Sequence, residues 1–445
     1  MADEEANTEG GAAAGQRPIS RTAFGIVFGV QVITATGNTG MQSVLPAIGR
    51  ESRIPDPLIA AIFSLSALLW AIFSPVWAKA SDRYGRKPLI VTGLLGFVVS
   101  MVLCGLVVAA GVRHLAAPML IFALFLAARG LFGLFGSAAN PASQAYLAER
   151  TSREKRTAAV ASLAGAFGLG TILGPPIAPL FVLPVVGLAG PMFGFAALAV
   201  IVLILVWRGL PEVWPRPGAV HALAETRGPP TKAPPLWKDP RIRPFLIYGL
   251  LVSTCQTAQY QTLGFIVIDK LGIAPIAAQR ATAVAMMAGA VSGLVAQWGL
   301  ISLFKMGPRQ LLRWGAGLAA VANLLVAIAP SYWTVVAGFT LSSLGYGFAR
   351  PGYSAGASLA VPTNDQARAA GAVAAVNGLN TVFAPLFVMA YEAWHPLPYL
   401  ANVAILVGLV SMAFLSPGLR HAGVAPPTEL EQVGAVERND ASSGF

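Results

Sequence analysis

Polar side chains recur at helical spacing inside an apolar stretch near the N-terminus. Gln31, Thr34, Asn38 and Gln42 are separated by three, four and four residues, which places them on one stripe of a helix. Arg129 lies inside another apolar stretch. Amide, hydroxyl and guanidinium groups in such positions hold a solute by hydrogen bonds and charge. The pattern therefore indicates binding chemistry.

Two later apolar stretches carry similar groups. Ser253, Gln256 and Tyr260 repeat the helical spacing, and Asn377 and Asn380 lie further along. The alternative is that such side chains only join helices, which is worth about 0.6 kcal/mol per bond in a membrane. We expect the following residues to line a substrate cavity or to take part in coupling: Gln31, Thr34, Asn38, Gln42, Arg129, Gln256, Tyr260, Asn377 and Asn380.

The residues of catalytic and metal sites are not grouped. The four histidines are scattered, without paired spacing, and none of the seven lysines follows a glycine as in a G-K-[ST] phosphate loop. None of the nineteen Asp and Glu residues lies near the middle of an apolar stretch. The sequence therefore predicts no enzyme, no metal site, no cofactor and no ATP drive.

Apolar stretches dominate the chain. Of its 445 residues, 56% are hydrophobic and 11% are charged, and the mean hydropathy is +0.67. A soluble domain carries about 25% charged residues, and a bilayer span needs about 20 mostly apolar residues. The composition predicts an all-α membrane protein with twelve transmembrane helices, near residues 22–48, 57–79, 88–111, 116–147, 157–183, 187–207, 244–268, 277–303, 309–329, 331–358, 366–393 and 397–417.

The longest gap between apolar runs divides the chain six against six. It holds eight prolines and seven Lys or Arg residues, a composition typical of a linker. We expect an N-terminal tail over 1–20, a six-helix bundle over 21–207, a cytoplasmic linker over 208–243, a second six-helix bundle over 244–417 and a C-terminal tail over 418–445.

Basic residues set the expected orientation. The net charge is +11, and 23 of the 30 Lys and Arg residues fall in segments that would be cytoplasmic if the chain starts inside. This asymmetry is the positive-inside bias of membrane proteins, so it points away from a nucleic-acid partner. We expect both termini in the cytoplasm of a bacterial cell, with the chain spanning the inner membrane.

The two halves carry paired motifs. Residues 82–87 read Asp-Arg-Tyr-Gly-Arg-Lys between the second and third runs, and Gly93 follows Gly85 by eight residues. Gly315 follows Gly307 by the same eight residues between the eighth and ninth runs. The separations between paired motifs range from 210 to 222 residues. They predict two pseudo-symmetric bundles that arose by duplication, with a binding site between them.

Residues 78–87 resemble the G-x-x-x-D-R-x-G-R-K signature of the major facilitator superfamily, with Ala78 in place of the leading glycine. The resemblance implies a conformational latch on the inner face. An aspartate accepts hydrogen bonds from arginine and favours a helix N-terminus, and a glycine permits a tight turn. The alternative is an ordinary basic loop. The expected latch residues are Asp82, Arg83, Gly85, Arg86 and Lys87.

Two further motifs resemble drug:proton antiporters of this superfamily. Residues 126–133 are similar to the motif around the arginine of helix 4, and the glycines near residue 170 are similar to G-x-x-x-G-P-x-x-G-G. Small residues let helices approach closely, and proline bends a helix; plain helix packing is the alternative. The helix-packing motif comprises Gly165, Gly170, Gly174 and Pro175.

The resemblance implies a secondary active transporter that works by alternating access. We expect export of a small amphipathic molecule such as a drug, siderophore or other metabolite, by a monomer that exchanges it for protons across the bilayer. A proton-coupled importer of the same superfamily is the alternative. Because arginines but no central acids lie within spans, the cavity should be neutral to positive and should prefer neutral or anionic molecules to cations.

Overall fold

The computed structural model describes residues 19–151, 153–211, 239–361 and 380–416, together with five single residues: 369, 372, 373, 376 and 419. Every element in this part of the chain is a helix. Eight helices are long and apolar enough to cross a membrane, which confirms an all-α membrane protein. Asn377, most of the expected linker and most of both expected tails lie outside the described residues.

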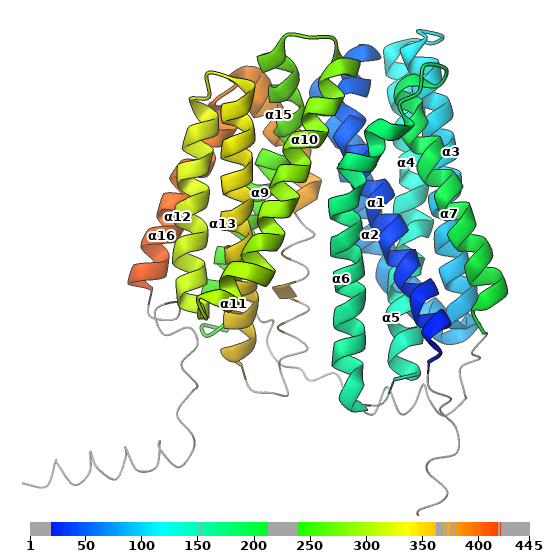
Figure 1. Ribbon diagram of the computed structural model, residues 1–445, viewed down its shortest axis with the longest axis horizontal. Helices are drawn as coiled ribbons and strands as arrows, with labels where there is room; N and C mark the ends of the chain where they lie inside the picture. The colour runs from blue at the N-terminus through cyan, green and yellow to red at the C-terminus, as the bar shows by residue number, and fades with distance from the viewer. Residues whose placement is uncertain are drawn as a thin grey trace, which may run out of the picture.

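The helices form two bundles that stand side by side (Figure 1). The first contains α1 (Arg21–Glu51), α2 (Asp56–Tyr84), α3 (Arg86–Val112), α4 (Pro118–Phe135), η1 (Gly136–Ala138), α5 (Ala139–Glu149), α6 (Arg153–Ile177), η2 (Ala178–Phe181), η3 (Gly187–Ala189) and α7 (Gly190–Gly209). The second contains α9 (Arg243–Leu271), α10 (Pro275–Leu294), η5 (Val295–Leu300), α11 (Ile301–Leu303), α12 (Pro308–Ala327), α13 (Tyr332–Leu359), η7 (Asn380–Phe383), α15 (Ala384–Ala393) and α16 (Leu397–Leu415).

The expected apolar runs coincide with helices, apart from the first part of 366–393, which lies mostly outside the described residues. Three long helices, α1, α9 and α13, are not among the eight that are apolar enough to cross a membrane. The buried faces of α1 and α9 include polar side chains such as Gln31, Ser43, Gln259 and Thr262. A helix that turns amides and hydroxyls inward gives a weak hydropathy signal, so its span has to be recognised from its neighbours.

The duplication is visible in the packing of glycines on alanines. A Cβ atom added to Gly93 of α3 would lie 2.5 Å from the backbone nitrogen of Ala139, and one added to Gly315 of α12 would lie 2.7 Å from that of Ala349. Only glycine permits this approach of two backbones. The same contact at equivalent places in both bundles confirms the pseudo-symmetry predicted from the paired motifs.

The two bundles meet mainly at one end. Helix α1 contacts α9 and α10, α6 contacts α10, and α2 contacts α15. In Figure 1 the bundles approach each other at the top, where α1, α10 and α15 lie, and diverge toward the bottom, where α5, α6 and α11 lie. We call these the Arg50 end and the Asp82 end, after the charged residue that each carries.

The glycines of α6 differ in their surroundings. A Cβ atom on Gly174 would overlap Thr39 and would lie 2.6 Å from the backbone nitrogen of Gly40. Gly170 likewise lies against α1, whereas Gly165 has nothing within 4 Å of its Cβ position. Gly170 and Gly174 therefore lie in close contact with α1, whereas no atom of the described residues comes close to the Cβ position of Gly165, where the motif also predicts close packing.

We expect Gly174→Ala to lower the free energy of unfolding by about 1–3 kcal/mol, because the added methyl group meets backbone that cannot move aside. Thermal unfolding of the detergent-solubilised protein, followed by size-exclusion chromatography, measures the effect. Gly165→Ala is the matched control and should be neutral or stabilising by about 0.5–1 kcal/mol, because alanine favours a helix. Equal destabilisation by both variants would contradict the packing difference.

Candidate gate and binding site between the bundles

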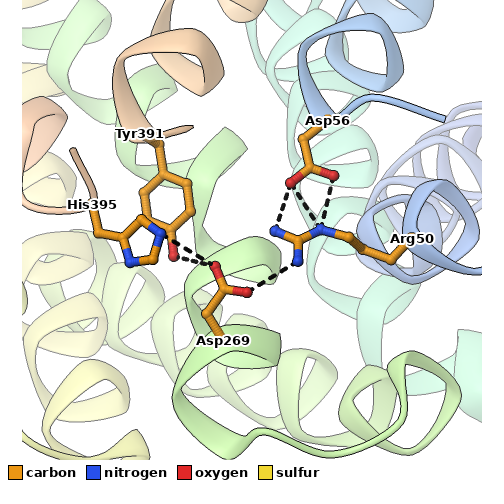
Figure 2. A network of polar contacts seen from close by, with 5 residues as sticks. All are labelled: Arg50, Asp56, Asp269, Tyr391 and His395. Atoms are coloured by element: carbon orange, nitrogen blue, oxygen red, sulfur yellow. Dashed lines mark hydrogen bonds and ion pairs between the residues drawn. The ribbon is translucent and has the colours of Figure 1, made fainter. Parts of the chain in front are cut away.

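A network of charged and polar side chains closes the Arg50 end (Figure 2). Arg50 is the penultimate residue of α1, and Asp56 is the first residue of α2. The Arg50 Nε donates to both carboxylate oxygens of Asp56, at 2.9 and 2.8 Å, and its Nη2 lies 2.6 Å from Oδ2. The turn between the helices, which ends at Pro55, brings these groups together within the N-terminal bundle.

Asp269, near the end of α9, accepts a hydrogen bond from Arg50 of the other bundle. The Arg50 Nη1 donates to Asp269 Oδ1 at 3.1 Å, and the Tyr391 hydroxyl of α15 donates to Oδ2 at 2.7 Å. His395 stacks on the Tyr391 ring at 4.6 Å, and its Nε2 lies 3.9 Å from Asp269. Arg50 and Asp269 thus form an ion pair between the two bundles.

The duplication explains why these two residues meet. Arg50 and Asp269 are 219 residues apart, which is within the range that separates the paired motifs. Each lies near the end of the first helix of its bundle, so the two positions are equivalent. This pair is not among the site residues predicted from the sequence. Opposite charges at equivalent repeat positions are the signal that could have found it.

A small cavity lies between the bundles beside this network. Its N-terminal side is formed by Gln42, Leu45, Pro46, Ile59 and Ala60, and its C-terminal side by Tyr260, Gln261, Gly264, Phe265, Thr282 and Met286. The guanidinium of Arg50 lies 5.8 Å from the centroid of the Phe265 ring. Phe265 therefore lines the cavity and also contacts Arg50 of the network.

Only part of the predicted polar stripe of α1 lines this cavity. Gln42 lines it together with Tyr260 of α9. Gln31 is buried, the Thr34 hydroxyl donates to Val30 O of its own helix at 2.8 Å, and Gln256 is exposed. In this conformation, Gln42 and Tyr260 are therefore the members of the predicted set that line the cavity.

Arg129 is enclosed within the N-terminal bundle. Its side chain is buried, with 1% of the residue exposed, and one Nη2–H donates to the Asn38 side-chain oxygen. The guanidinium also lies over two aromatic rings, at 4.6 Å from Phe63 and 4.4 Å from Phe132. Aromatic faces attract a cation electrostatically. Contrary to the prediction, Arg129 does not lie on an open cavity surface in this conformation, because α1, α2 and α4 supply these neighbours.

Two donors of Arg129, Nε and Nη1, have no hydrogen-bond partner among the described residues. A buried donor without a partner costs about 1–3 kcal/mol, and more when the group is charged. These two nitrogens are therefore able to donate to a solute or to water that enters the bundle in another conformation.

Asn380 joins two elements of the C-terminal bundle. Its side-chain oxygen accepts from the Thr254 hydroxyl of α9 at 2.7 Å, and its Nδ2 donates to Val376 O at 3.0 Å. The residue is 1% exposed. Among the described contacts it acts between helices, which is the alternative role for such side chains. Asn377 lies outside the described residues.

The expected latch residues surround a buried arginine at the Asp82 end. The Arg86 Nη1 donates to Asp82 at 2.6 Å, and its Nε and Nη2 donate to Glu149 of α5 at 3.0 and 2.5 Å. Gly85 has φ 95°, which a residue with a side chain rarely adopts. Arg83 is exposed, and Lys87 is half-buried. The ion pairs of Arg86 stay within the N-terminal bundle, so they do not join the two bundles in this conformation.

Comparison with known families gives one match that extends over most of the chain. The family model described as Major Facilitator Superfamily matches residues 27–385. A stretch of 174 residues, 39% of the chain, is 30% identical to a probable actinorhodin transporter of Streptomyces coelicolor and covers 28% of it. A stretch of 81 residues, 18% of the chain, is 31% identical to an uncharacterized MFS-type transporter of Bacillus subtilis and covers 21% of it. The chain therefore spans about a quarter of the length of these curated relatives.

Solved structures share the fold at low identity. A POT family transporter in complex with 5-aminolevulinic acid aligns with a TM-score of 0.66 and 12% identity over 90% of this chain and 96% of that chain. The human organic anion transporter MFSD10 aligns with a TM-score of 0.60 and 18% identity over 89% of this chain and 100% of that chain. At these identities the similarity establishes the arrangement of the helices and nothing about the substrate.

Proposed function

Because the chain belongs to the Major Facilitator Superfamily, and is thus a multi-pass membrane transporter and not an enzyme, we propose that it exports a small amphipathic organic molecule in exchange for protons. Transport proceeds by alternating access, in which one end of the interface between the bundles is closed at a time. The substrate is a drug, siderophore or other metabolite that is neutral or anionic.

The ion pair between Arg50 and Asp269 is the observation that supports alternating access. It joins the bundles at one end, whereas the ion pairs of Arg86 at the opposite end lie within one bundle. A transporter that opens its two ends alternately must have one end closed and the other end open in each of its states. We therefore assign the Arg50–Asp269 network as the gate at the Arg50 end.

Charge supports the orientation. Arg83, Arg86 and Lys87 lie at the Asp82 end, and 23 of the 30 basic residues belong to segments that would lie on that side. By the positive-inside rule this end faces the cytoplasm. The gate then faces outward, both termini lie in the cytoplasm, and a monomer spans the bacterial inner membrane.

The direction of transport rests on two supports. The motif around Gly174 resembles antiporters that export drugs, and one relative is named a probable actinorhodin transporter. A proton-coupled importer remains the second candidate. A structural neighbour that is named as a peptide transporter shares the fold, but its identity of 14% gives no support for the direction.

Inverted membrane vesicles test the function. With an acidic lumen, they should accumulate a fluorescent neutral or anionic amphiphile, and collapse of the pH gradient by an ionophore should abolish the accumulation. Vesicles without the protein are the control. Accumulation of a labelled organic anion by intact cells, driven by external protons, would instead establish import.

We expect Asp82→Asn to leave insertion intact but to slow transport at least tenfold, because one end-state loses a charge-assisted hydrogen bond. Stability should change little, since Glu149 still pairs with the buried Arg86. Glu149→Gln is the comparison and should lower the unfolding temperature more, because it removes the stronger partner of Arg86. Initial transport rates and unfolding temperatures of both variants measure these effects. A normal transport rate for Asp82→Asn would show that the loop only orients the helices in the membrane.

A further inference from the structure

Two glutamines occupy equivalent positions at the cavity between the bundles. Gln42 of α1 and Gln261 of α9 are 219 residues apart, which is the separation of Arg50 and Asp269. Both line the same cavity. Each bundle therefore contributes one amide to the cavity and one residue to the Arg50–Asp269 ion pair beside it.

Both amides are half-buried and line the cavity from opposite bundles. Among the described residues, the side chains of Gln42 and Gln261 have no hydrogen-bond partner. A half-buried amide can still reach water, so a polar group of a bound molecule would replace that water and form hydrogen bonds that an apolar group cannot form. The cavity volume is about 20 Å³, which is room for one water molecule or one small substituent of a larger molecule.

The lining of the cavity is uncharged. Its eleven residues include no Asp, Glu, Lys, Arg or His. The nearby guanidinium of Arg50 is engaged by Asp56 and Asp269, so it is not an unengaged counter-ion for an anion in the cavity. An ion placed between the amides would lose its hydration without gaining an unengaged counter-ion, which is costly.

Apolar side chains complete the walls. Leu45 and Ile59 line the cavity from the N-terminal bundle, and Phe265 and Met286 line it from the C-terminal bundle. These walls surround a volume of about 20 Å³, which leaves room for no more than one small substituent. The site thus combines two amides with apolar walls, which suits a small uncharged hydrogen-bonding substituent of a larger molecule.

We propose that Gln42 and Gln261 form a subsite that holds a neutral hydroxyl or carbonyl group of the transported molecule at the closed end. The amide NH₂ groups donate to a carbonyl or hydroxyl oxygen, and an amide oxygen accepts from a hydroxyl. The subsite selects neutral polar substituents against ammonium and carboxylate groups. This inference rests on the proposed transport function and narrows its substrate class to neutral amphiphiles.

Four anthracene derivatives that differ only in one substituent test the selectivity. 9-Anthracenemethanol carries a neutral hydroxyl, 9-methylanthracene is apolar, anthracene-9-carboxylate is an anion and 9-anthrylmethylammonium is a cation. Binding to the purified full-length protein in detergent is measured by fluorescence, without a pH gradient. We expect 9-anthracenemethanol to bind about three- to tenfold more tightly than 9-methylanthracene, the gain of one hydrogen bond.

Substitutions of the two glutamines test whether the preference for the hydroxyl compound arises in the cavity. Gln42→Leu and Gln261→Leu should each remove the preference for the hydroxyl while leaving the affinity for 9-methylanthracene unchanged. Gln42→Glu keeps the shape and adds a carboxylate, so it should shift the preference toward the ammonium derivative. Gln297→Leu is the matched control, because Gln297 of η5 is exposed and lies outside the cavity.

The outcomes separate the two proposals. Loss of the hydroxyl preference in both cavity variants, but not in Gln297→Leu, supports the subsite. No preference in the unmodified protein, a preference for either ion, or an equal loss of affinity for all four compounds overturns it. Because binding needs no gradient, failure of proton-driven accumulation would overturn the transport proposal while leaving the binding result in place.

Discussion

Asp269→Asn should open the Arg50 end roughly tenfold more often and slow transport by a similar factor. The variant keeps a hydrogen-bond acceptor for Tyr391 but removes the negative charge that Arg50 meets across the interface. Charge-assisted hydrogen bonds contribute about 1.5–3 kcal/mol when buried. The partial exposure of this pair, 34% for the Arg50 side chain and 21% for that of Asp269, reduces the value toward 1–2 kcal/mol.

Asp56→Asn provides a matched control. Asp56 also pairs with Arg50, and at a shorter distance, but both residues belong to the N-terminal bundle. If the ion pair between bundles closes the gate, Asp269→Asn should have the larger effect on opening. If the two carboxylates serve only to neutralise the charge of Arg50, Asp56→Asn should have the larger effect, because Asp56 lies closer to Arg50.

Labelling of a single introduced cysteine measures the opening. Ala60 lines the cavity and is 4% exposed, so Ala60→Cys should react slowly with a membrane-impermeant thiol reagent that is added from the Arg50 side. Both native cysteines are buried and give the background. Equal labelling rates for Ala60→Cys alone and for Ala60→Cys combined with Asp269→Asn would show that the Arg50–Asp269 pair is not a gate.

Arg129→Met should abolish coupled transport, at least a hundredfold loss, without destabilising the protein. Methionine fills a similar volume, and it removes two buried donors that have no partner among the described residues. Replacing a buried charge with an apolar side chain is often neutral or stabilising. If the variant folds normally but does not transport, Arg129 acts in another step of the transport cycle, where its charge or its donors are used.

Arg129→Lys should also reduce transport, since an ammonium group cannot stack as a planar guanidinium does over Phe63 and Phe132. Arg313→Met is the control, because Arg313 also stacks on an aromatic ring, Phe414 at 3.8 Å, but lies outside the cavity. Transport rates and unfolding temperatures of the three variants distinguish the roles. A large fall in the unfolding temperature of Arg129→Met would show that Arg129 is structural.

The sequence by itself determined the class of protein and its internal symmetry. Apolar runs of about 20 residues can avoid unpaired backbone groups in a bilayer as helices, so composition alone predicts a helical membrane protein. The glycines that follow Gly85 and Gly307 by eight residues revealed the duplication, because backbone contact between helices tolerates no side chain. Such requirements are local, and they can be identified from the residue types and their spacing.

Only the tertiary structure decided which polar groups meet. Arg50 and Asp269 form a pair because two equivalent helix ends converge, although 219 residues separate them. Arg129 and Gln42 both belonged to the predicted cavity, yet Arg129 is enclosed by aromatic rings and Gln42 lies at the interface. Helical spacing specifies the face on which a side chain lies but not which neighbour covers that face. The packing of one bundle against the other determines that neighbour, because it brings together residues that are remote in sequence.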